Sequence, residues 1–88
     1  MIGMNYKILL TKQFSIDFKK LRDKKTKGKI KKKIEEVRED PLRYKRLHYE
    51  LKGSFRIRIG SYRIIYSIDE SKKEMYLEKI VFDHKYRR

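Results

Sequence analysis

The sequence predicts an α+β fold with the element order β-α-α-β-β-β, in which a helical hairpin packs on one face of a mainly antiparallel, twisted sheet. Three observations predict this fold. Apolar residues recur at helical spacing in two early segments, two β-prone runs flank a tight turn, and a further β-prone run follows a polar turn. The 88 residues suffice for one modest core, so residues 1–88 are expected to form a single domain.

The first two elements are expected to be a strand and a helix. Tyr6–Leu10 is apolar and β-prone, and Thr11 behind it is a suitable helix N-cap. Phe14, Phe18 and Leu21 then fall at positions i, i+4 and i+7. This spacing predicts an amphipathic helix with one buried stripe.

A second helix is expected from about Lys29 to Glu39. Its apolar stripe consists of Ile30, Ile34 and Val37. The segment before it, residues 23–28, is polar, and Gly28 is expected to break the chain between the two helices. Pro41 is expected to end the second helix because proline cannot continue a helical backbone.

A basic and aromatic connector, Leu42–Lys52, leads to the first strand of a hairpin. Basic residues interleaved with Tyr44 and Tyr49 suit RNA, whose bases stack on aromatic rings, although each tyrosine could equally pack on the rim of the core. The last strand is expected over Met75–Phe82, and its pattern does not decide which residues face the core.

The hairpin is centred on Gly60-Ser61, a pair that suits a two-residue type II′ turn. This turn pairs Arg58 with Arg63 and Ile57 with Ile64. One face of the hairpin then carries Phe55, Ile57, Ile59, Tyr62, Ile64 and Tyr66. The other face carries Arg56, Arg58 and Arg63 around Ile65.

The arginine-bearing face points to an anionic ligand. Like charges directly opposite each other destabilise a sheet, and Arg58 faces Arg63. A phosphate chain relieves that repulsion, and arginine is suited to bidentate phosphate contacts. The alternative is a polar sheet face that only meets solvent.

The net charge of +14 favours a polyanion or an acidic protein as the partner. A lysine-rich surface of a heat-adapted organism is the alternative, but acidic residues normally accompany it in near balance. With no cysteine, the chain is compatible with a reducing cytoplasm, the expected location. No apolar run reaches membrane-spanning length, and neither a metal site nor a cofactor is expected.

Without a metal site or a cofactor, the chemistry that the sequence still allows is metal-free cleavage of RNA. RNA carries its own nucleophile in the 2′-hydroxyl group. The protein has to orient that group, neutralise developing charge and move two protons. Arginine is never deprotonated in proteins, so the arginines can supply only charge. Candidates for proton transfer are His84, Lys85, Tyr86 and Lys52.

The chain resembles the RelE/ParE toxin superfamily. The resemblance is carried by Asp40-Pro41, Leu47, Leu51-Lys52-Gly53 and the run from Phe55 to Tyr66, FRIRIGSYRIIY. It implies the toxin of a toxin–antitoxin pair that enters the ribosomal A site and cuts mRNA there without a metal. Some RelE members have lysines where this chain has Arg56 and Arg58.

Carried over residue by residue, the resemblance implies that Arg56 and Arg58 match two basic positions of the first hairpin strand and that Arg63 matches the arginine of the Tyr-Arg pair. In the tail, Lys85 or Arg87 matches a basic residue and Tyr86 a tyrosine. The residues expected to act in catalysis are Arg56, Arg58, Arg63, Lys85, Tyr86 and His84. The residues expected to bind RNA are Lys24, Lys25, Lys27, Lys29, Lys31, Lys32, Lys33, Arg43, Lys45, Arg46, Lys52 and Arg87.

The implied partners are an acidic RelB-like antitoxin, the ribosome and mRNA, with the toxin and antitoxin forming a hetero-oligomer. Two rival functions stay open: a ParE-like inhibitor of DNA gyrase without enzymatic activity, and a basic RNA-binding module without catalysis. The lysines between Lys24 and Lys33 could also form an ordinary solvated helix face.

Overall fold

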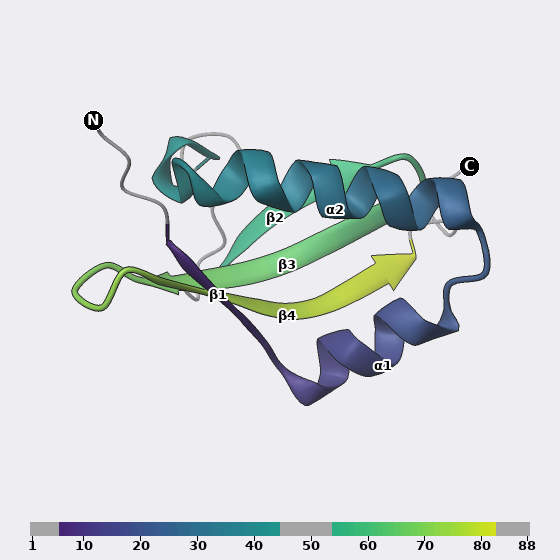
Figure 1. The fold of residues 1–88 in the computed structure, drawn as a ribbon, viewed down its shortest axis with the longest axis horizontal. Coiled ribbons are helices and arrows are strands. Elements are labelled where there is room, and N and C mark those ends of the chain that lie inside the picture. Colours follow the sequence, from purple (N-terminus) through teal and green to yellow (C-terminus); the bar gives the residue numbers. More distant parts are fainter. Residues whose placement is uncertain (1–5, 45–53, 83–88) are drawn as a thin grey trace.

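The computed structural model describes residues 6–44 and 54–82. The elements follow the predicted order, with a short 3₁₀ helix after the second α-helix (Figure 1). They are β1 (Lys7–Leu10), α1 (Lys12–Lys20), α2 (Lys24–Arg38), η1 (Pro41–Tyr44), β2 (Phe55–Ile59), β3 (Tyr62–Asp69) and β4 (Glu74–Phe82).

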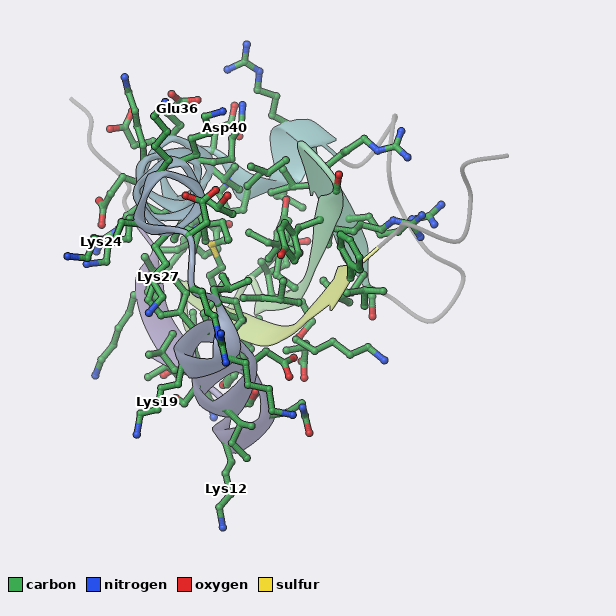
Figure 2. The ribbon with its side chains drawn as sticks, turned by 90° about the vertical axis from the view of Figure 1, so that its right-hand side faces the viewer. Lys12, Lys19, Lys24, Lys27, Glu36 and Asp40 are labelled. Atoms are coloured by element: carbon green, nitrogen blue, oxygen red, sulfur yellow. The ribbon has the colours of Figure 1, made fainter. Side chains whose placement is uncertain are left out.

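The four strands form one twisted sheet in the order β1-β4-β3-β2 (Figure 1). The β2–β3 and β3–β4 pairs are antiparallel, whereas β1 and β4 are parallel. The sheet is therefore mixed and mainly antiparallel, as predicted. Both helices lie on the same side of it, which Figure 2 shows edge-on.

The predicted hairpin is confirmed in register and in turn type. Arg58 lies opposite Arg63 and Ile57 opposite Ile64. Gly60 has a φ of 60°, and Ser61 is not among the residues with positive φ. A positive φ at the first turn residue alone is the signature of a type II′ turn.

The core fills the space between α2 and the hairpin. All three stripe residues of α2 are buried, and Phe55 and Tyr66 from the hairpin stack with ring centroids 4.9 Å apart. The Tyr66 hydroxyl donates to the Pro41 carbonyl oxygen at 2.9 Å. This bond ties η1 to the middle of the sheet and satisfies a hydroxyl group that is fully buried.

Side chains at helix α1 form hydrogen bonds with the backbone of β4 near and beyond the point where its pairing with β1 ends. Its N-cap residue Thr11 accepts a hydrogen bond from the Phe14 N–H and donates to the Leu77 and Glu78 carbonyl oxygens, at 3.0 and 2.9 Å. The Asp17 carboxylate accepts the Ile80 N–H at 2.9 Å. Two polar side chains at this helix thus pair the Glu78 carbonyl oxygen and the Ile80 N–H, which lie beyond the last β1 partner, Leu77.

The prediction for the start of α2 was wrong. The helix begins at Lys24 rather than near Lys29, and Gly28 lies inside it. Asp23 is the N-cap: its carboxylate accepts the Lys25 N–H at 3.0 Å and the Thr26 hydroxyl at 2.7 Å. This cap supplies hydrogen-bond acceptors for N–H groups of the first turn that have no partner within the helix. The helix therefore continues past Gly28, because a glycine inside a helix costs only about 1 kcal/mol relative to alanine.

A β-bulge explains why the faces of β4 could not be assigned from sequence. Tyr66 lies opposite Leu77 but Ile65 lies opposite Lys79, so Glu78 is an extra residue in β4. Leu77 is buried and Ile80 packs against the core. The residues that face the core therefore change parity at the bulge.

Among the described residues, no helix is long and apolar enough to cross a membrane.

We predict that Gly28→Ala stabilises the protein by about 1 kcal/mol, because alanine is the better helix former. A Cβ at this position meets nothing within 4 Å. Gly60→Ala is the matched control: it adds the same methyl group where φ is +60°, and it should destabilise the protein instead. Urea denaturation measures both, and a loss of stability in Gly28→Ala would contradict the prediction.

We predict a pH-dependent role for the Asp23 charge. The Thr26 hydroxyl, followed by the Lys25 N–H, lowers the pKa of Asp23 below its ordinary value. A lowered folded-state pKa stabilises the fold above the unfolded-state pKa of about 3.9, and this contribution is lost as pH falls through the folded-state value. Asp23→Asn should therefore have a lower Tm than the parent protein at pH 7, and the gap should close in acid.

The control for this experiment is Glu70→Gln, which removes a charge from the exposed turn between β3 and β4. Equal Tm values for Asp23→Asn and the parent at neutral pH would show that the charge at this cap contributes nothing.

Candidate nucleic-acid interface

The sheet face that points away from the helices carries Arg56, Arg58 and Arg63 around Ile65. We call this group the arginine face. Its arginines alternate along the strands with core residues, and successive strand side chains point to opposite faces. Because both helices cover the core side, the arginines point to the side without helices.

The hairpin register brings three arginines together on one short stretch of the sheet. Arg58 lies directly opposite Arg63, and Arg56 lies opposite Ile65. Opposed residues on adjacent strands have Cα atoms about 4.5–5.5 Å apart. Arg58 is exposed, whereas Arg56 and Arg63 are half-buried. Planar guanidinium groups on adjacent strands suit the bidentate binding of phosphate oxygens.

The same sheet face is acidic at its other end. Asp69 lies opposite Glu74, and the Tyr76 hydroxyl donates to the Glu74 carboxylate. That carboxylate raises the pKa of Tyr76, whereas the Ser71 hydroxyl lowers the pKa of Asp69. These carboxylates make this end less favourable for phosphate than the arginine end of the same face.

A second basic surface covers the helices. Its members are exposed lysines of α1 and α2, and Figure 2 shows Lys19 and Lys24 pointing away from the sheet. This lysine surface consists of Lys12, Lys19, Lys20, Lys24, Lys25, Lys29, Lys31 and Lys32. The remaining two predicted lysines of α2 are engaged locally. The Lys27 ammonium lies 5.2 Å from the centroid of the Phe18 ring, and Lys33 Nζ lies 3.4 Å from Glu36 Oε1.

The predicted residues therefore fall on two opposite sides of the molecule. The arginine face is the outer face of the sheet, and the lysine surface is the outer face of the helical layer. Arg43 is exposed and lies on η1, an element that carries none of the residues of either surface.

Sequence reasoning missed four residues of these surfaces. Lys12, Lys19 and Lys20 extend the lysine surface onto α1, and their positions off the apolar stripe of that helix were the available signal. Lys79 lies on the side of the arginine face, because the bulge places it opposite Ile65. No periodicity could reveal Lys79, since the bulge itself breaks the pattern.

Several predicted residues lie outside the described part of the chain: Lys45, Arg46, Lys52, His84, Lys85, Tyr86 and Arg87. The assignment of a proton-transfer residue stays a prediction for that reason. Within residues 6–44 and 54–82, no three histidine, cysteine, aspartate or glutamate residues gather in a group that could hold a metal ion.

An apolar groove of about 520 Å³ lies between β1 and the two helices. Its lining includes Leu10, Phe14, Phe18 and Ile34, with Lys19, Lys31 and Glu35 among its polar residues. Leu10 is 58% exposed, so a large apolar side chain at this groove is in contact with solvent. A groove of this composition suits an apolar segment of a protein partner rather than a nucleic acid.

The comparisons with known proteins agree with this architecture. A family model described as the ParE toxin of the type II toxin–antitoxin system parDE matches residues 8–80. A chain of the toxin–antitoxin complex RelBE2 from Mycobacterium tuberculosis is 26% identical, with a TM-score of 0.72 over 89% of this chain and 98% of that chain. No curated protein matches the sequence.

Two further solved structures share the fold at lower identity. A chain of the archaeal RelE–RelB complex from Pyrococcus horikoshii is 21% identical, with a TM-score of 0.77 over 96% of this chain and 99% of that one. The isolated RelE toxin from Escherichia coli is 20% identical, with a TM-score of 0.76 over 88% of this chain and 83% of its own. The predicted α+β fold is thus confirmed by structures of RelE toxins.

We predict that a short single-stranded RNA perturbs two separate sets of backbone amide signals in an NMR titration, one in β2 and β3 and one in α1 and α2. The physical reason is that the two basic surfaces lie on opposite sides of the sheet. In an Arg58→Gln, Arg63→Gln variant, the strand set should lose its response and the helix set should keep it. Perturbations confined to the helices in the parent protein would contradict binding at the arginine face.

Proposed function

The chain belongs to the ParE toxin family of type II toxin–antitoxin systems, within the RelE/ParE superfamily, and from that premise we propose that it is a ribosome-dependent endoribonuclease that cuts mRNA in the ribosomal A site. The observation that supports this proposal is the arginine face. A toxin that acts only by binding a protein needs no three arginines around one apolar residue on one face of the sheet.

In the proposed reaction the 2′-oxygen of one nucleotide attacks the adjacent phosphorus. The new bond joins phosphorus to the 2′-oxygen, and the bond from phosphorus to the 5′-oxygen of the next nucleotide breaks. The products are a 2′,3′-cyclic phosphate and a 5′-hydroxyl end. Arg58 and Arg63 bind the non-bridging oxygens and stabilise the charge that develops there, and Arg56 supports them.

Two protons must move in this step, one from the 2′-hydroxyl group and one to the leaving 5′-oxygen. Arginine can do neither at physiological pH. We assign these roles to the tail residues His84, Lys85 and Tyr86, which follow β4 directly in the sequence. Support comes from the position of β4, whose Val81 lies opposite Arg63.

The lysine surface would hold the ribosome. Its charges face away from the sheet, so it can contact ribosomal RNA while the arginine face contacts mRNA. Non-specific attraction to the RNA backbone is the expected role of exposed lysines of this kind. Dependence on the ribosome follows, since the arginine face alone offers charge but little orientation of the RNA.

The proposed partner in the resting state is an acidic, RelB-like antitoxin in a hetero-oligomer, in the cytoplasm. The structures similar to this chain include complexes of toxin and antitoxin. On this chain, the apolar groove beside Leu10 and the net charge of +14 suit an acidic segment with apolar anchors.

A second candidate function is inhibition of DNA gyrase without enzymatic activity. The matching family model favours it, because its description is that of a ParE toxin. The arginine face has no assigned role in this alternative. A basic RNA-binding module without catalysis is the third possibility, and the experiment below separates all three.

The test is translation of a defined mRNA with purified ribosomes, with 5′ ends mapped by primer extension. We predict cuts at the A-site codon, reduced about 100-fold in Arg63→Ala, which is typical of removing one charge-stabilising donor. Lys72→Ala, which removes a charge from the exposed turn between β3 and β4, is the control and should cut normally.

Intact mRNA, together with inhibition of gyrase in a supercoiling assay, would reverse the order of the first two functions. Binding to ribosomes with neither cleavage nor gyrase inhibition would leave the RNA-binding module.

A further inference from the structure

We propose that Lys79 is a fourth phosphate-binding residue of the site, delivered to the arginine face by the β-bulge in β4. The inference rests on the proposed function, because it assumes that the arginine face binds RNA. It extends the site from the two strands of the hairpin to a third strand. The ligand is a second phosphate of the same RNA strand, next to the one held by Arg58 and Arg63.

The direction of the Lys79 side chain follows from the residues on both sides of it. Leu77 is 1% exposed and faces the core, and Ile80 lies opposite the fully buried Ile64. In a regular strand only one of the two residues between these positions would point outward. The bulge makes both Glu78 and Lys79 point away from the core.

The bulge also separates the two side chains it exposes. The Ser67 hydroxyl donates to a carboxylate oxygen of Glu78 at 2.6 Å. Ser67 lies toward the acidic end of the face, so this bond holds the carboxylate away from the arginines. Lys79 lies opposite Ile65, the residue that the arginines surround.

Lys79 completes a row across three strands. The row begins with Arg56 on β2, which lies opposite Ile65 on β3. Ile65 in turn lies opposite Lys79 on β4. Adjacent strands are about 4.8 Å apart, so the Cα atoms of Arg56 and Lys79 are roughly 10 Å apart. That width leaves room for two phosphates of one strand running across the sheet, one at the hairpin and one beside Lys79.

A purely structural role does not account for Lys79. The residue is exposed, and both ion pairs found within the described part of the chain lie on α2. A charged residue at this position gains nothing from the neighbouring arginines. A phosphate chain that runs along the row would bind Lys79 together with the arginines.

The experiment measures binding of a fluorescent oligouridylate by anisotropy over a series of salt concentrations, for the full chain without ribosomes. Each lost phosphate contact should lower the slope of log K against log salt by about 0.7 for single-stranded RNA. We expect that change in Lys79→Gln and a slope near the parent value in Lys79→Arg. Lys72→Gln is the matched control, since it removes the same charge from an exposed turn, and its slope should stay that of the parent.

The outcomes separate this inference from the proposed function. If Arg58→Gln lowers the slope while Lys79→Gln matches Lys72→Gln, the arginine face binds RNA and Lys79 takes no part. If neither Arg58→Gln nor Lys79→Gln changes the slope, the arginine face does not bind RNA, and both the inference and the proposed function fail.

Discussion

The two-residue turn at Gly60-Ser61 is the constraint on which the rest of the molecule depends. It fixes the register of β2 against β3, and side chains alternate between the faces with a period of two. A slip by one residue would place Arg58 on the same face as an isoleucine of β3, so one of the two strands would turn its arginines into the core and its isoleucines into solvent. One face of the hairpin is buried against α2. Because the turn fixes the register, the arginines of both strands then point to the opposite face.

Much of this arrangement was predictable because it is local. The hairpin needs only a turn and two alternating runs, and the cap at Thr11 and the stripe of α2 are equally short-range. The start of α2 was missed because Gly28 and its polar neighbours suggest a break, whereas the hydrogen bonds of Asp23 decide the matter. The bulge at Glu78 and the parallel pairing of β1 with β4 are tertiary features, which no window along the chain reports. The arginine face was consequently found and Lys79 was not.

The chemistry of the arginine face sets a limit on what the sheet itself can do. Arginines hold and neutralise phosphate without exchanging protons, so charge stabilisation and proton transfer are assigned to different parts of the chain. The two carboxylates at the other end of the same face are consistent with this division, because they favour the region around Ile65 for an anion. The lysine surface lies on the opposite side of the molecule and is suited to attraction rather than to chemistry. In the proposed function, the helices bind the ribosome and the sheet acts on the mRNA.

The most direct test of that division is the rate of mRNA cleavage on stalled ribosomes, measured under single-turnover conditions over a range of toxin concentrations. The two variants to compare are Arg58→Gln with Arg63→Gln, and Lys24→Gln with Lys25→Gln, Lys29→Gln and Lys32→Gln. The account predicts that the arginine variant has a maximal rate lowered by about 100-fold or more. The lysine variant should reach the parent rate at a higher toxin concentration. The reverse result, a normal maximal rate in the arginine variant and a lowered one in the lysine variant, would place the chemistry on the helices and contradict the account.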